Sequence, residues 1–69
     1  MDRTPVSSSN IASIGYDQES STLEVEFNNG AIYQYFDIGE NLYNQLMSAD
    51  SKGGFLASNI KGSYRFSKV

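Results

Sequence analysis

The clearest hydrophobic pattern in the chain is the strict alternation of apolar and polar residues over Leu23–Phe27. Such alternation is typical of a β-strand that buries one face only. The following Asn28-Asn29-Gly30 segment favours the positive φ angles of a tight hairpin turn. An aromatic-rich run, Ala31–Phe36, comes next. The sequence therefore predicts a β-hairpin.

Two loop lengths fit this hairpin, and they place the side chains of the second strand on opposite faces of the sheet. A two-residue Asn29-Gly30 turn would put Gln34 among the apolar residues of the first strand and leave Tyr33 and Tyr35 in solvent. A three-residue Asn28-Asn29-Gly30 loop, with Gly at the left-handed position, would reverse this arrangement. We favour the three-residue loop, because it avoids burying an unpaired amide at a cost of roughly 1–3 kcal/mol.

The remaining patterns predict one more strand and two helices. Ile11–Tyr16 alternates weakly, with Ala12, Ile14 and Tyr16 on one side, and predicts a first strand. Apolar residues recur at helical spacing in the sequence after Asp37, and they predict a helix over Glu40–Ser48. A second, short helix is expected after Asp50-Ser51, with Phe55, Leu56 and Ile60 as its apolar stripe and Gly62 as its C-terminal cap.

These elements predict an α+β fold, in which a three-stranded antiparallel β-meander is covered on one face by two short helices. Residues 1–9, with Pro5 and three consecutive serines, are expected to form a flexible leader. Residues 10–69 are expected to form a single domain. Ser63–Ser67 could be either a terminal strand or an extended tail packed on the helices.

Composition argues against most enzymes. The 69 residues include neither His nor Cys, so the commonest general base, the thiolate nucleophile and the usual zinc ligands are all missing. The acids are scattered singly, and Gly53-Gly54 is not part of a phosphate-binding loop. We therefore expect a non-enzymatic module without cofactor or metal. The chain also lacks a membrane span and a signal peptide, and we expect a cytoplasmic location.

The net charge of −3 is unevenly distributed. Met1–Asp50 has one base and eight acids, whereas Ser51–Val69 has four bases and no acid. A basic terminal segment can attract nucleic acid. On charge alone, neutralisation of the acidic body by this segment is the simpler interpretation.

An ordered set of short motifs resembles the KTSC domain, a small bacterial and phage module named after its occurrence at the C-terminus of some lysyl-tRNA synthetases. The motifs are Ser8-Ser9 before Ile11, Ile14-Gly15-Tyr16-Asp17, Leu23-x-Val25-x-Phe27 with Gly30, Tyr33-Gln34-Tyr35, Ser51-x-Gly53-x-Phe55, and Ile60-Lys61 before Tyr64. One departure is Ile38-Gly39, where such domains often have Val-Pro. The chain begins with its own Met, so we expect a stand-alone form of the domain.

The resemblance implies a possible RNA-binding role and no established activity. Exposed aromatic rings and cations at the C-terminal end would suit RNA. The candidate RNA-binding residues are Lys52, Lys61, Tyr64, Arg65 and Lys68. Glu24 and Glu26 argue against this role, because they would repel phosphate from the exposed face of the hairpin.

The alternative is a module that binds another protein or itself through the open sheet face or an edge strand. That face would contain Glu24, Glu26, Ile32, Gln34 and Phe36. The remaining motif residues are expected to be structural: Tyr16, Gly30, Tyr33, Tyr35, Ser51, Gly53, Phe55 and Ile60.

Overall fold

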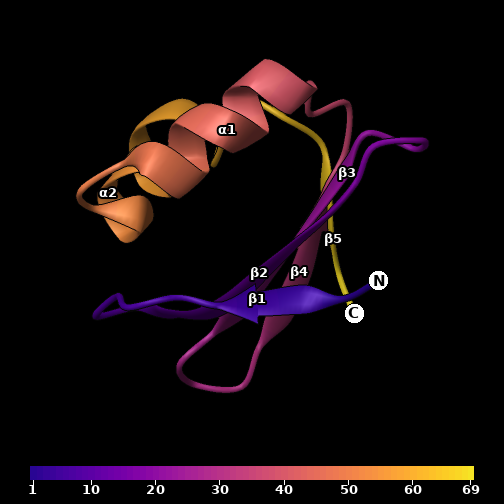
Figure 1. Cartoon of the computed structure of the whole chain (residues 1–69). Helices are drawn as coiled ribbons and strands as arrows, with labels where there is room; N and C mark the ends of the chain where they lie inside the picture. The colour runs from indigo at the N-terminus through magenta and orange to yellow at the C-terminus, as the bar shows by residue number, and fades with distance from the viewer.

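The computed structural model describes all 69 residues and shows an α+β fold with one antiparallel sheet. The elements are β1 (Arg3–Pro5), β2 (Ile11–Asp17), β3 (Thr22–Phe27), β4 (Ile32–Tyr35), α1 (Glu40–Ser48), α2 (Lys52–Asn59) and β5 (Phe66–Lys68). The strands lie in the order β1-β2-β3-β4-β5, and both helices, inserted between β4 and β5, lie on the same side of the sheet (Figure 1). The predicted α+β class and the two helices are confirmed.

The sheet has five strands, so the predicted number of three was wrong. Strand β1 lies inside the range 1–9 assigned to a leader, and it pairs with β2 through Arg3 opposite Gly15 and Pro5 opposite Ser13. The segment was missed because it has no alternating pattern, and its pairing depends on the free edge of β2.

Strand β5 confirms the strand alternative for the last two residues of Ser63–Ser67, whereas Ser63 and Tyr64 lie in a turn and a bend before it. Its residues pair with β4, with Phe66 opposite Tyr35 and Lys68 opposite Tyr33. Backbone hydrogen bonds flank this pairing, since Phe36 N donates to Arg65 O at 2.9 Å and Val69 N donates to Ile32 O at 2.9 Å.

The hairpin register predicted from the three-residue loop is confirmed. Phe27 N donates to Ala31 O at 2.8 Å, and Gly30 has a φ of 91°, as the left-handed loop position requires. Tyr33 consequently pairs with Val25, and Tyr35 pairs with Leu23, on the face that the helices cover. Gln34 lies opposite Glu24 on the other face.

The core lies between the helices and the inner, helix-covered face of the sheet. The nine buried apolar residues are Ile11, Ile14, Leu23, Val25, Tyr35, Ile38, Leu46, Leu56 and Ile60. The register shifts between Ile11 and Ser13, so Ile11 and Ile14 are both buried, whereas simple alternation predicted Ala12 with Ile14. Neither helix is long and apolar enough to pass through a lipid bilayer.

Candidate functional site

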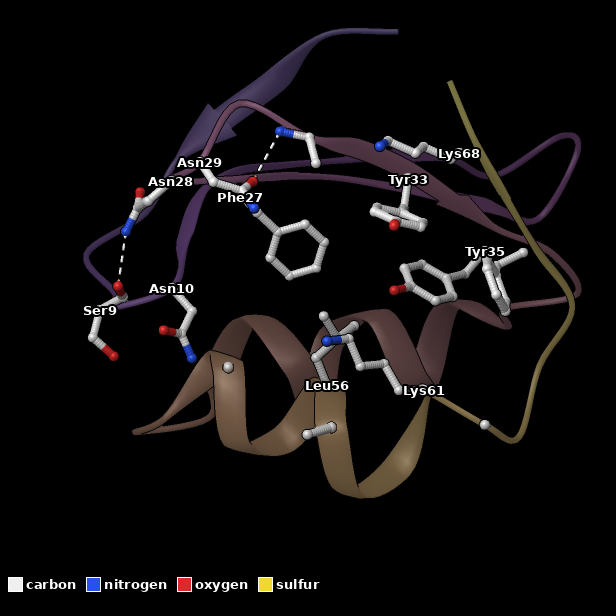
Figure 2. A pocket seen from close by; sticks show the side chains of 15 residues that line it. Ser9, Asn10, Phe27, Asn28, Asn29, Tyr33, Tyr35, Leu56, Lys61 and Lys68 are labelled. Atoms are coloured by element: carbon white, nitrogen blue, oxygen red, sulfur yellow. Dashed lines mark hydrogen bonds between the residues drawn. The ribbon is translucent and has the colours of Figure 1, made fainter.

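A cleft of about 790 Å³ lies between the inner face of the sheet and α2 and is here called the aromatic cleft. Figure 2 shows the rings of Phe27, Tyr33 and Tyr35 pointing from the sheet toward α2, with Lys61 rising from the helix side. Phe66 and Lys68 of β5 complete the lining. The volume lies within the range of roughly 300–1,000 Å³ that is typical of ligand sites.

The four aromatic rings of the cleft form one contiguous cluster. The centroid of Tyr33 lies 5.8 Å from that of Phe27 and 5.9 Å from that of Phe66. Tyr35 lies 6.4 Å from Tyr33 and 6.0 Å from Phe66. Exposure increases outward, from 2% for Tyr35 to 58% for Phe66, and burial raises the pKa of the Tyr35 hydroxyl. The outer rings can therefore accept a flat ligand while the inner ring stays in the core.

Two lysines give the cleft a positive charge. The Nζ atom of Lys61 lies 5.1 Å from the ring centroid of Phe27, a cation–π arrangement. Lys68 enters from β5 beside Tyr33. None of the eight acidic residues lines the cleft. The site is thus locally cationic in a chain whose net charge is −3.

Three asparagines form the polar end of the cleft, at the hairpin loop and the start of β2. Asn28 Nδ2 donates to Ser9 O at 2.9 Å, and Asn29 Oδ1 accepts from Ala31 N at 3.0 Å. A Cβ atom on Gly53 would lie 3.2 Å from Asn10 Nδ2, so α2 approaches this end closely. These contacts hold the polar end in place against the helix.

The outer face of the sheet, opposite the helices, is occupied by an internal polar network. Glu24 accepts from Arg3 Nη1 at 2.7 Å and from Gln34 Nε2 at 2.9 Å. Ser13 Oγ donates to Glu26 at 2.9 Å. The hydrogen bond from Gln34, followed by the hydrogen bond and charge of Arg3, lowers the pKa of Glu24 against the opposing effect of burial. Both glutamates lie on the sheet face away from the cleft, and neither lines it.

The two apolar residues expected on that outer face are half-buried. Ile32 is opposite Glu26, and the guanidinium carbon of Arg65 lies 5.6 Å from the ring centroid of Phe36. They form no large exposed apolar patch, since the large exposed hydrophobic residues of the chain are Met1, Phe66 and Val69.

A second, more open hollow of about 550 Å³ lies beside the aromatic cleft, here called the side hollow. It is lined by Phe36, Gly62, Ser63, Tyr64, Arg65 and Phe66. Arg65 Nη2 donates to Asp37 Oδ2 at 3.2 Å across its rim. Gly62 and Phe66 belong to both hollows.

The structure therefore divides the five predicted RNA-binding residues among three places. Lys61 and Lys68 line the aromatic cleft, and Tyr64 and Arg65 line the side hollow. Lys52 lies outside both hollows and donates to the Ala49 carbonyl at 3.3 Å. No group of three or more acidic side chains comes together in a way that could hold a metal ion.

Sequence reasoning missed several residues of the cleft, namely Phe27, Phe66, Asn10, Asn28 and Asn29. Phe27 could have been found from strand parity, because the favoured register places it beside Tyr33. Phe66 and the asparagines could not, since their place depends on how β5 and α2 dock against the sheet.

The motif residues outside the cleft make contacts within the fold. The Tyr16 hydroxyl donates to Ile38 O at 2.6 Å, and its ring stacks on Tyr43 at 4.5 Å between centroids. Ser51 Oγ accepts from Gly54 N at 3.1 Å and caps α2. Ile60 is fully buried, and Phe55 packs against the core.

The sequence matches the KTSC domain over residues 7–64, and similar proteins agree with this match. A crystal structure of a KTSC domain protein from Yersinia pestis superposes with a TM-score of 0.93 at 45% identity, covering 99% of this chain and 96% of that one. An uncharacterised protein of Stutzerimonas stutzeri is 43% identical over 53 residues, which are 77% of this chain and 75% of that protein.

Larger proteins contain a similar segment. A lysine–tRNA ligase of Nostoc punctiforme is 34% identical over 59 residues, which are 86% of this chain and 10% of the ligase. The chain thus spans about a tenth of the length of that enzyme. Sequence match and shared architecture together show that this chain belongs to the KTSC domain family.

Proposed function

We propose that the protein binds single-stranded RNA in the aromatic cleft. The observation that supports this most directly is the combination of partly exposed rings, Tyr33 and Phe66, with Lys61 and Lys68 in a hollow that no acid lines. Stacking of a base on an aromatic ring contributes roughly 1–3 kcal/mol, and lysines complement the phosphates of an unpaired strand. The polar end offers amide groups that can hydrogen-bond to base edges.

The relatives favour RNA over other anionic ligands. Proteins named lysine–tRNA ligase contain a segment similar to this chain, and that name identifies tRNA as their ligand. A domain that binds unpaired RNA would suit such an enzyme, because loops and ends of a folded RNA present unstacked bases.

The alternative, an interaction with another protein or with a second copy through the outer face, has weaker support. Glu24 and Gln34 hydrogen-bond to each other there, and Arg3 satisfies the remaining carboxylate oxygen. A partner would have to compete with these internal bonds.

The test is a titration of the isotope-labelled protein with a pool of random-sequence RNA hexanucleotides at about 50 mM salt, followed by NMR. Amide shifts are expected at Phe27, Tyr33, Lys61 and Phe66, and they should fade as salt is raised. Lys61→Gln should weaken binding about 5- to 10-fold at this salt concentration. The reason is that each phosphate contact on a single strand contributes about 0.7 to the slope of log K against log[salt].

Lys52→Gln is the matched control, because it removes the same charge outside both hollows. Its affinity should stay within about twofold of the wild type. Absence of shifts at low salt would contradict RNA binding, and equal losses in the two variants would contradict the cleft as its location.

A further inference from the structure

The aromatic cleft and the side hollow adjoin at Phe66. This ring touches the Tyr33–Tyr35 cluster on one side, lines the side hollow on the other, and is 58% exposed. Gly62, with a φ of 82°, lies in both linings and adds no side chain between them. A ligand that leaves the cleft past Phe66 therefore enters the side hollow.

Arg65 is available to a ligand at that point. Its side chain is 77% exposed, and its partner Asp37 is 72% exposed. Ion pairs between exposed groups contribute little to stability, so exchange of this carboxylate for a phosphate is inexpensive. The planar guanidinium matches two phosphate oxygens, and the ring of Phe36 supports it at 5.6 Å.

We propose that a bound RNA strand runs from the aromatic cleft past Phe66 into the side hollow, where Arg65 exchanges Asp37 for a phosphate. The site then distinguishes strands by length, since a dinucleotide fills only the cleft and a longer strand also reaches Arg65. This inference rests on the proposed function, because it extends the same site. Asp37 acts as the anion that occupies Arg65 until a strand of sufficient length arrives.

Two opposing substitutions test the inference on the full chain, with random-sequence RNA dinucleotides and hexanucleotides as probes. Arg65→Gln should weaken hexanucleotide binding about 5- to 10-fold at about 50 mM salt and reduce the salt slope by about 0.7. Asp37→Asn should strengthen hexanucleotide binding. Asn is suitable at this position because residue 37 has a φ of 62°, which Asn tolerates better than most residues. Dinucleotide affinity should change by less than about twofold in both variants.

Matched controls separate this exchange from a general change of charge. Glu40→Gln removes an acid that lines neither hollow, and Lys52→Gln removes a base outside both. The path predicts that Asp37→Asn binds the hexanucleotides more strongly than Glu40→Gln does. It also predicts that Arg65→Gln binds them more weakly than Lys52→Gln does. Both results together would establish the path.

The outcomes distinguish the two proposals. In one outcome, both oligonucleotides bind through Lys61, but Arg65→Gln and Asp37→Asn change hexanucleotide affinity no more than their control variants do. The extended path is then wrong, and RNA binding in the cleft stands. If neither oligonucleotide binds, the proposed function itself is wrong and the path with it.

Discussion

At the scale of single residues, the two tyrosines of the Tyr33-Gln34-Tyr35 motif have different environments although they share a face. Tyr35 is 2% exposed and belongs to the core, whereas Tyr33 is half-buried at the wall of the aromatic cleft. The motif thus supplies one residue that holds the sheet to the helices and one that a ligand can reach.

We expect Tyr35→Ala to lower the free energy of unfolding by about 3–5 kcal/mol, because a large core aromatic is removed. Tyr33→Ala should cost less, because part of this ring already contacts water. Urea denaturation of both variants measures the difference, and equal losses would contradict the division of roles.

The outer-face network predicts a pH dependence of stability. The folded-state pKa of Glu24 lies below its ordinary value of 4.5, so the charged form is favoured in the folded protein. The stability that it adds is fully present above pH 4.5 and is lost as the pH falls through the lower folded-state value.

Urea midpoints measured from pH 6 down to pH 3 should therefore fall less steeply in Glu24→Gln than in the wild type. Glu19→Gln is the control, because Glu19 is exposed on the β2–β3 turn, and it should follow the wild-type curve. Parallel curves for all three proteins would show that Glu24 is not the group responsible.

The residue-scale facts were partly accessible from sequence. The cost of burying Gln34 selected the correct register, and the register placed Tyr33, Tyr35 and Glu24 on their proper faces. The network partner Arg3 was not accessible, since it lies in a segment whose strand pairing has no local pattern.

At the scale of elements, β1 depends on the absence of a side chain in the strand beside it. A Cβ atom on Gly15 would lie 2.6 Å from the backbone oxygen of Asp2 and 3.0 Å from Arg3 Cγ. The segment that leads into β1 therefore approaches this glycine closely, and Gly15 is needed for that approach.

Gly15→Ala should accordingly lower the free energy of unfolding by about 1–3 kcal/mol through overpacking. Gly39→Ala is the comparison, because nothing lies within 4 Å of its position and its φ is −72°. It should cost less than about 1 kcal/mol, as for a helix N-cap that makes no side-chain bond. An equal loss in the two variants, measured by urea denaturation, would remove the argument for close contact.

The helices were the elements best predicted from sequence. The apolar spacing behind Asp37 and the cap at Ser51 are local signals, and both helices begin where these signals indicate. The edge strands β1 and β5 are only three residues long, so neither has enough positions to establish a period of two.

At the scale of the whole molecule, acids of Met1–Asp50 and bases of Ser51–Val69 are also separated in space. The glutamates of β3 lie on the outer face, and Lys61 and Lys68 meet at the cleft on the inner side. Their meeting was beyond sequence reasoning, because it requires α2 and β5 to dock on the same face. A protein of net negative charge thus has a cleft lined by cations and by no acid.

The docking of β5 has a consequence for how the cleft forms. Phe66 pairs with Tyr35 across a long intervening segment that includes both helices, whereas the other strands pair with sequence neighbours. Closing that long loop costs chain entropy, and a three-residue terminal strand opens readily. Phe66 and Lys68 line the cleft only while β5 is paired with β4, so a ligand that contacts them would stabilise the closed C-terminus. RNA should therefore slow hydrogen–deuterium exchange at the Ser67 amide while leaving the centre of β3 unchanged.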